Sequence, residues 1–556
     1  MSNCAQCSQA FENPQSLLDF LERIAPVFNG KKISIPPPTL CTGCRLQRRL
    51  AHRNEKTLFE RKCDKTGEMM ISIHAPNDGY KVVHKDEWWS DNWDPLDFGR
   101  DFNFDRPFFE QFEELQKQVP RMSLLQEKNE NSDYASNVSY LKNCYLLFSA
   151  DHDKDCCYGV WIERSRDCFD NMLIDECERT YETIFSDKIY NSSFIYSCSQ
   201  CRDSAFLRDC RGCSDCLMCW GLRNKQYHIA NQPYSKEEYL KKLEEYPLSS
   251  YKNMMSCKEQ FNGMIKDSIQ PEMRKKGRVV DSTGDFLHDT ENCINCFELS
   301  FSKDCTNTTG FQMKDGYDCT YANGEFAYET CECFPVPSHS GFDLNSYTGS
   351  NLWYCDLCMN NCQNMFGCVG FKKASYCILN KQYTQEEYEE LVPKIIEHMT
   401  KTKEWGEFFP IKISPIGYNI SEANAFFSLD KKGIEKNGWK WQEEIDIEKD
   451  HNFWEGEIPD DIKDVDESIC EYVLKCEVSG KAYKIISQEF VFLKQIGLPI
   501  PRRHPDQRHK DRFALRNPRQ LWERQCEKCK KDIQTTYSPE RTERIYCEEC
   551  YMAEVY

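Results

Sequence analysis

Two nested duplications constrain the fold of this chain more than any other feature. Near the two ends, Cys63 matches Cys526 within segments that align at an offset of 463, and further upstream the offset becomes 472. In the centre, residues 141–243 match residues 290–392 at an offset of 149. Repeats of this kind are repeated structural units. The sequence therefore predicts two similar terminal modules around two similar central ones.

The terminal modules carry cysteines at metal-ligand spacing. Each copy has positions for two sets of the form C-x2-C followed by C-x2-C, and each copy keeps only one complete set. Four thiolates at this spacing close tetrahedrally around zinc, usually as a structural site. We predict two zinc-ribbon-like modules and two Zn2+ per chain. The predicted ligands are Cys4, Cys7, Cys41 and Cys44 in one module, and Cys526, Cys529, Cys547 and Cys550 in the other.

The other two sets are degenerate. Thr66, Ser479 and Gln507 stand at three of the ligand positions. We interpret both as knuckles that have lost their metal, because the matching copy is complete. The alternative is an open metal site that activates water, as in a metal-dependent hydrolase. The remaining candidate ligands are Cys63, His84 and Glu87 in the first module and Cys476 and His504 in the second.

The central copies show a short strand-like period. Pieces that begin near Cys144, Cys156 and Cys168 follow one another at steps of 12 residues, with Asp, Asn and Ser in the turns. This pattern favours a parallel β-solenoid in which about 12 residues make half a coil and cysteines line the interior. A helix follows each copy, at 235–246 and 384–399, as a cap. The expected fold is mainly β with α: a duplicated, capped solenoid flanked by the two zinc modules.

A run of four cysteines from Cys210 to Cys219, spaced C-x2-C-x2-C-x2-C, is typical of an iron–sulfur ligand set. The second copy has Met359 and Met365 at two of these positions. Methionine replaces a buried apolar residue more readily than a thiolate ligand. We therefore predict that these cysteines fill the interior, with a metal site in the first copy alone as the alternative.

This reading divides the chain into seven segments. Two are zinc modules, two are solenoid copies with their capping helices, and three connect them. In order they are an N-terminal zinc module (1–90), an aromatic and acidic connection (91–140), the first solenoid (141–246), a helical linker (247–289), the second solenoid (290–400), an acidic, tryptophan-rich linker (401–468) and a C-terminal zinc-ribbon module (469–556).

Arginines beside the cysteine sets have helical spacing and would form two cationic stripes. Such stripes neutralise phosphates, which makes a nucleic-acid-binding or ribosome-associated protein one alternative function. The other interpretation is that they pair with carboxylates of this chain, whose net charge is -19. The stripes are Arg45, Arg48, Arg49 and Arg53, and Arg508, Arg512 and Arg516.

Recognised catalytic motifs are missing: the sequence has no G-x-S-x-G, Walker A, H-E-x-x-H or G-x-G-x-x-G pattern. A carbohydrate-active solenoid enzyme, which needs acids such as Asp167, Asp170 and Asp175 on one face, remains an alternative, although Asp is also a turn residue. No apolar run is long enough for a membrane span, and the first residues do not resemble a signal peptide. With 34 cysteines and no export signal, we expect reduced thiols and a cytoplasmic location.

Three stretches carry a family resemblance: residues 40–64, 88–102 and 546–556. They resemble a family of uncharacterised cysteine-rich zinc-ribbon proteins from uncultivated bacteria with small genomes, over the full length. The resemblance implies zinc and a cytoplasmic setting, and it implies no activity. In that family the positions of His84 and Glu87 are often cysteines, and this chain departs from the pattern there.

The interpretation that combines these observations is a non-enzymatic, zinc-binding scaffold or interaction protein. Its partner would be a protein or, in the alternative above, a nucleic acid or the ribosome. No membrane partner is expected.

Overall fold

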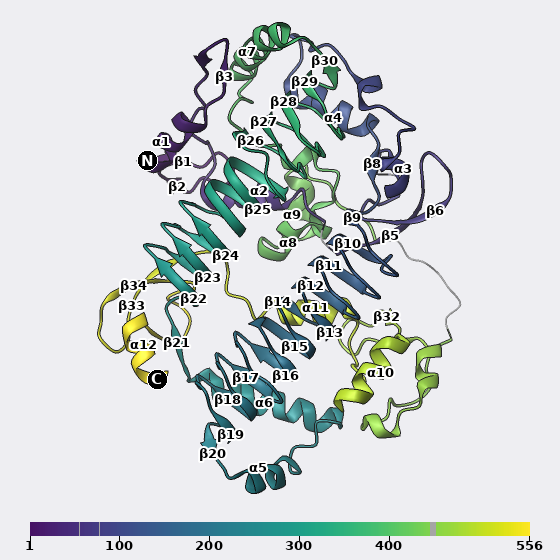
Figure 1. Cartoon of the computed structure of the whole chain (residues 1–556), viewed down its shortest axis with the longest axis vertical. Helices are drawn as coiled ribbons and strands as arrows, with labels where there is room; N and C mark the ends of the chain where they lie inside the picture. Colours follow the sequence, from purple (N-terminus) through teal and green to yellow (C-terminus); the bar gives the residue numbers. More distant parts are fainter. Residues whose placement is uncertain (55, 77, 445–451, 556) are drawn as a thin grey trace. The chain divides into compact units, whose positions relative to one another are not determined.

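The computed structural model describes residues 1–54, 56–76, 78–444 and 452–555, which form two compact units. Unit 1 comprises residues 1–124, 273–444 and 519–521, and unit 2 comprises the remainder. Each unit therefore combines one terminal module with one solenoid (Figure 1). The N-terminal module shares its unit with the second solenoid, and the C-terminal module shares its unit with the first.

The first solenoid is a stack of parallel strands closed by one antiparallel strand, β20 (Gln232–Pro233). This confirms the predicted parallel β-solenoid, although the stack begins before residue 141. Its parallel strands are β9 (Gln126–Glu127), β10 (Ala135–Ser139), β11 (Tyr145–Asp151), β12 (Cys157–Glu163), β13 (Arg166–Phe169), β14 (Met172–Asp175), β15 (Glu178–Asp187), β16 (Tyr190–Tyr196), β17 (Ala205–Arg208), β18 (Ser214–Trp220) and β19 (Gln226–Ile229).

The predicted coil length was wrong by a factor of two. Leu147 pairs with Ala135 on one side and with Gly159 on the other, so partners in neighbouring coils are 12 residues apart. Twelve residues therefore make a whole coil, where we expected half of one. The coil is this short because the backbone turns at every third residue: Asp155 has φ 55° and Tyr158 has φ 59°, both in the left-handed region. Each coil thus has four corners.

Interior side chains also recur every third residue. Cys156, Ile162, Ser165 and Cys168 are all buried inside the first solenoid. The thiol of Cys156 donates to the carbonyl of Lys154, two residues earlier, at 3.3 Å. The Ser165 hydroxyl donates in the same way to the carbonyl of Glu163 at 2.8 Å. Small side chains that donate a hydrogen bond therefore satisfy the corner backbone, and cysteine and serine interchange for this reason.

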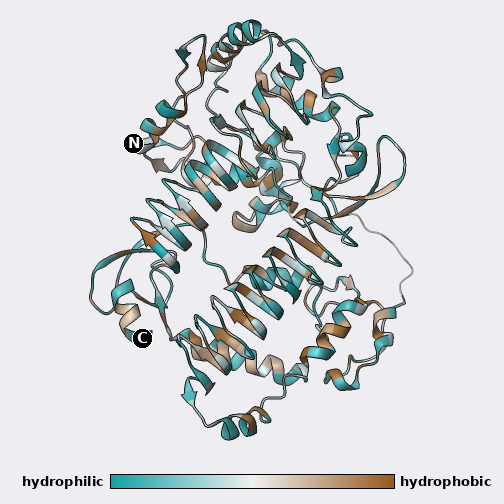
Figure 2. Cartoon of the chain, in the orientation of Figure 1, coloured by the Kyte–Doolittle hydropathy of each residue, from teal (hydrophilic) through white to brown (hydrophobic). Residues whose placement is uncertain are grey.

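The second solenoid follows the same plan and ends in the antiparallel strand β30 (Lys381–Gln382). It starts at residue 275, so the predicted linker 247–289 is helical only in α6 (Tyr251–Lys266) and strand-forming after it. Its parallel strands are β22 (Lys275–Val280), β23 (Gly284–Glu291), β24 (Cys296–Lys303), β25 (Gly310–Cys333), β26 (Ser340–Gly341), β27 (Gly349–Trp353), β28 (Cys362–Phe366) and β29 (Ser375–Ile378). Figure 2 shows hydrophilic and hydrophobic residues mixed along these strands.

A capping helix follows each solenoid, as predicted. Helix α5 (Lys236–Leu243) starts at a capping box formed by Ser235 and Glu238. Helix α7 (Gln385–Lys401) starts at the matching box, formed by Thr384 and Glu387. Such a box satisfies two of the otherwise unpaired amide groups at the start of a helix, which explains why both helices begin at equivalent positions.

The terminal modules have matching elements at the sequence offsets. Helix α1 (Gln15–Ile24) corresponds to α10 (Ser487–Ile496), and α2 (Thr42–Leu50) to α11 (Pro505–Phe513). In unit 1 the module also contains β1 (Ser2–Asn3), β2 (Ala10–Phe11), β3 (Val27–Phe28), β4 (Lys31–Lys32), β5 (Phe59–Lys62), β6 (Met69–Ser72), β7 (Val82–Val83) and α3 (Lys85–Trp89). In unit 2 it contains β31 (Leu474–Lys475), β32 (Ala482–Tyr483), β33 (Trp522–Gln525), β34 (Asp532–Thr535), β35 (Arg544–Tyr546) and α12 (Glu548–Val555).

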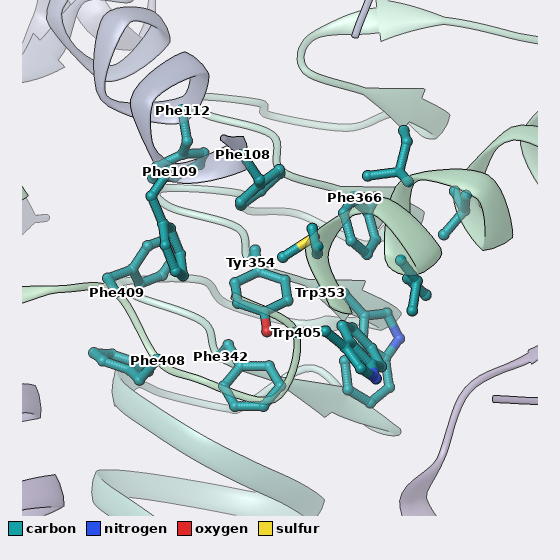
Figure 3. Packing of buried hydrophobic residues seen from close by; sticks show 14 of the residues in the cluster. Phe108, Phe109, Phe112, Phe342, Trp353, Tyr354, Phe366, Trp405, Phe408 and Phe409 are labelled. Atoms are coloured by element: carbon teal, nitrogen blue, oxygen red, sulfur yellow. The ribbon is translucent and has the colours of Figure 1, made fainter. Parts of the chain in front are cut away.

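The segments between modules and solenoids add to the two units. In unit 1, helix α4 (Phe108–Gln118) packs on the second solenoid through an aromatic cluster in which Phe108, Phe112, Tyr354 and Phe409 are fully buried (Figure 3). The remaining strands and α-helices are β8 (Arg121–Met122), α8 (Glu422–Phe426), α9 (Lys431–Lys436) and, in unit 2, β21 (Ile269–Pro271). The residues that the structure describes also include five short 3-10 helices, at Pro95–Phe98, Ile411–Ile413, Tyr418–Ile420, Ile462–Asp464 and Glu467–Glu471. The predicted acidic linker 401–468 is mostly irregular, and its residues 445–451 lie outside the described residues.

Among the described residues, no helix combines the length and the apolar character that crossing a membrane requires.

Candidate metal centres

Four equivalent knuckles occur, two in each unit. Each consists of a short antiparallel hairpin that supplies two ligand positions and the start of a helix that supplies two more. The residue four positions after the first cysteine is left-handed in every case, and its amide donates to the carbonyl of that cysteine at 2.9 Å. In chain order, we call the knuckles that start at Cys4, Cys63, Cys476 and Cys526 the first, second, third and fourth knuckle.

The first and fourth knuckles have four converging thiols. In each set, all four sulfur atoms lie within 4.8 Å of one another. The Sγ atoms of Cys7 and Cys41 are 3.7 Å apart, as are those of Cys529 and Cys547. In a tetrahedral site with metal–sulfur bonds of about 2.3 Å, two sulfurs are separated by about 3.8 Å. The structure therefore brings both predicted sets together in groups that could hold a metal ion.

The pKa shifts of the cysteines in these two groups are consistent with a metal-binding geometry. Burial acts to raise the pKa of Cys4, but hydrogen bonds from the backbone of Cys7, Cys41 and Gln6 outweigh it and lower the pKa to about 6. The pKa of Cys526 is lowered to about 6 in the same way. Burial and the neighbouring thiols instead raise the pKa of Cys550 to about 12. One thiolate thus forms readily in each group, whereas four need a bound cation to balance their charge.

In the second knuckle, the candidate ligands have other partners. His84 precedes α3, and its Nδ1 accepts the amide hydrogen of Asp86 at 3.3 Å. Glu87 pairs with Lys65 at 2.8 Å. Cys63 is buried and accepts hydrogen bonds from the Thr66 side chain and backbone, which lower its pKa against the effect of burial.

The third knuckle repeats this arrangement. Nδ1 of His504 accepts the amide hydrogen of Asp506 at 3.0 Å at the start of α11. The Ser479 amide donates to the sulfur of Cys476 at 3.4 Å. In the described part of the chain, the groups of three or more converging ligands are the two Cys4 sets alone, so neither degenerate knuckle brings three ligands together.

The run from Cys210 to Cys219 lies inside the first solenoid, where all four cysteines are fully buried. Their thiols donate to backbone carbonyls: Cys213, for example, donates to Arg211 and Leu222, both at 3.5 Å. This is the same role as that of the interior serines. Within the residues that the structure describes, these cysteines do not converge as a metal-ligand group.

The arginine stripe of unit 1 is buried. Arg45 donates to Asp318 at 2.9 Å, and Arg48 pairs with Glu329 at 3.0 Å and Glu407 at 2.6 Å. The other two arginines of the stripe lie in the same interface between α2 and the second solenoid: Arg49 donates to Thr320 at 3.0 Å, and Arg53 pairs with Glu332 and Glu422. All four residues are at most 6% exposed.

The stripe of unit 2 is buried in the same manner. Arg508 pairs with Glu489 at 2.8 Å and with Asp170, which also accepts from Arg512 at 2.6 Å. Arg516 is half-buried, with its guanidinium 4.9 Å from the centre of the Phe513 ring. The six buried arginines thus do not form the exposed stripes that the nucleic-acid alternative requires. Apart from Glu489, which is in the same module as Arg508, their carboxylate partners lie far away in the sequence, so spacing along the chain gave no signal for them.

The three candidate acids of the first solenoid have different partners. Asp170 is fully buried between the two arginines, whereas Asp175 pairs with Arg164 at 2.5 Å on the surface. Asp167 lies 3.6 Å from Arg166. All three carboxylates therefore have structural partners.

No family model matches the chain, and a search of curated proteins found no match.

Proposed function

We propose that this protein is a non-enzymatic scaffold in which one structural zinc ion closes each terminal module. The observation that carries the proposal is the pair of Cys4 groups in the first and fourth knuckles. Four thiolates complete a tetrahedral zinc shell and leave no position for water or substrate, which is typical of structural rather than catalytic zinc.

Buried ion pairs between the module and the solenoid of each unit support a structural role. Arg45 and Arg508, which begin the two stripes, pair with buried carboxylates and hold a helix of the module against a solenoid. The proposal places the protein in the cytoplasm, because none of its 34 cysteines forms a disulfide and thiols stay reduced there. It also includes membership of the zinc-ribbon family that the sequence resembles.

The test is a metal analysis of the full-length protein purified without added metal. We expect two zinc ions per chain, and X-ray absorption should show four sulfur neighbours at about 2.3 Å and no oxygen or nitrogen neighbour. Cys44→Ser and Cys550→Ser should each reduce the content to one zinc. Cys257→Ser, which changes a buried thiol of α6 outside the knuckles, is the matched control and should leave two.

Iron in place of zinc, or an oxygen or nitrogen ligand in the shell, would contradict the proposal. So would two zinc ions that survive in the Cys44→Ser, Cys550→Ser double variant.

A further inference from the structure

The last coils of the two solenoids have the same backbone arrangement. Asn231 in unit 2 accepts from the amide of Trp220 at 3.0 Å and donates to its carbonyl at 2.9 Å. Asn380 in unit 1, at the offset of 149, makes the same two bonds to Val369, both at 2.8 Å. The two ends are therefore equivalent, and what covers them can be compared directly.

In unit 1 an acidic, aromatic segment of the chain, residues 90–101, covers this end. Asn380 donates a further bond to the carbonyl of Pro95 at 3.1 Å. Lys372 lies over the ring of Trp93, 5.3 Å from its centre, and Lys381 pairs with Asp101 at 2.6 Å. The segment thus places an indole against one lysine of the solenoid and the Asp101 carboxylate against another.

In unit 2 the equivalent end has a cavity of about 370 Å³. Helix α12 occupies part of the region, since a Cβ at Gly221 would lie 3.5 Å from Val555. Trp220, half-buried, and Arg208 contribute to the lining, together with Lys225.

Some charged side chains that line this cavity form ion pairs, and others do not. Arg223 pairs with Asp209 at 2.9 Å, and Glu554 pairs with Lys528 at 2.6 Å. Among the described residues, neither Arg208 nor Lys225 forms an ion pair, although the charge of Arg208 contributes, after Arg541, to a lowered pKa of Glu543. The guanidinium of Arg208 lies 4.6 Å from the centre of the Tyr196 ring. The cavity therefore presents an indole surface and two cationic groups that form no ion pair with the described residues.

We propose that this cavity binds an acidic peptide segment with a tryptophan, supplied by a partner protein. The segment would resemble residues 90–99, which cover the equivalent end in unit 1 and carry three aspartates. Its indole would pack on Trp220, and its carboxylates would pair with Arg208 and Lys225. The inference rests on the proposed scaffold function and names the chemistry of the partner.

The experiment uses full-length protein and the blocked peptide SDNWDPLDFG, the sequence of residues 90–99, in isothermal titration calorimetry. We expect a dissociation constant on the order of 50 µM, in the range of small peptide interfaces. The Arg208→Glu, Lys225→Glu double variant should bind at least about tenfold more weakly, because both charges are reversed. Lys241→Glu, on the exposed face of α5, changes the same charge away from the cavity and should bind normally.

Two further peptides test which side chains of the peptide contribute to binding. Replacement of the tryptophan by alanine, or of all three aspartates by asparagine, should each weaken binding by about tenfold or more. No binding up to about 1 mM peptide would overturn the proposal. Equal binding to the double variant would do the same, as would binding of a nucleotide such as ATP at this cavity in preference to the peptide.

The zinc content of the same samples separates this inference from the proposed function. Two zinc ions without peptide binding would contradict the peptide site alone. Circular dichroism of every variant verifies that the loss of binding is not a loss of fold.

Discussion

Units 1 and 2 each contain a terminal module with two knuckles and one solenoid, yet their groups of four thiols lie at different knuckles. Unit 1 has the four thiols in its first knuckle and a degenerate second one, whereas unit 2 has a degenerate third knuckle and the four thiols in its fourth. All four hairpins nevertheless keep the same turn, with a 2.9 Å bond back to the first cysteine. The comparison teaches that the turn of the hairpin keeps its hydrogen bond where the set of four thiols is incomplete, so the turn does not depend on a full ligand set.

The degenerate knuckles show what replaces the ion. His84 and His504 cap the helices that follow them, and the lone sulfurs of Cys63 and Cys476 accept hydrogen bonds from their own turns. In the complete knuckles, the metal would instead join the hairpin to the helix covalently. Four predictions test this difference, from the largest expected effect to the smallest.

Loss of a ligand at a complete knuckle should have the largest effect. Structural zinc contributes about 10–16 kcal/mol in small zinc modules, so Cys44→Ser should leave the first knuckle largely without protected amides. Hydrogen exchange followed by mass spectrometry measures this directly. Protection in the second knuckle should persist, because its turn does not depend on metal. Equal loss of protection in both knuckles would break the comparison.

Removing the shared carboxylate of the buried arginines should destabilise unit 2. Asp170→Asn leaves the buried Arg512 without its charge partner and leaves Arg508 with Glu489 alone, and a buried charge that loses its partner typically costs about 3–5 kcal/mol. Urea denaturation measures the free energy of unfolding. Glu178→Gln is the matched control, since its partner Arg166 is half-exposed, and such pairs contribute about 1 kcal/mol or less. Similar values for the two variants would show that the cluster is not important for stability.

Restoring thiols should turn the second knuckle into a metal site. The triple variant Thr66→Cys, His84→Cys, Glu87→Cys should bind a third zinc ion, because the backbone of the complete knuckles is already present. With free zinc at about 100 times its dissociation constant, this binding should stabilise the fold by about 2.7 kcal/mol. Metal analysis and thermal unfolding with and without chelator provide the readout. A variant that still holds two zinc ions would show that the hairpin and α3 are not in register for a metal.

The smallest effect concerns two interior carboxyls, Asp153 and Asp343, one in each solenoid. Burial raises the pKa of both well above the ordinary value, against one backbone hydrogen bond each. The folded state therefore keeps a proton that the unfolded state releases, and stability falls as pH rises above the ordinary pKa of Asp, near 4. Asn171 fills an equivalent position and accepts the amide of Thr183 at 2.7 Å.

Asp343→Asn should thus stabilise the protein by about 1–2 kcal/mol at pH 8, and the gain should shrink as the pH falls toward about 4. Unfolding in urea across this pH range measures it. A gain independent of pH would mean that the wild-type carboxyl does not hold its proton in the fold.

The sequence by itself determined the parts that depend on local spacing. The offsets of 463 and 472 predicted matching modules, and α2 and α11 begin and end at equivalent residues. The C-x2-C pairs predicted both Cys4 groups, because two cysteines on one turn face the same point whatever surrounds them. The interior cysteines were predictable from the 12-residue repeat, and the capping helices from their own residue pattern, because both signals are local in the sequence.

Only the tertiary structure decided the coil length, the partners of the arginines and the solenoid that each module joins. A step of 12 residues fits half of a large coil or the whole of a small one, and the left-handed backbone at every third residue selects the small one. Arg45 meets Asp318 across 273 residues of chain. Such contacts depend on packing between distant segments, and no periodicity within either segment encodes them.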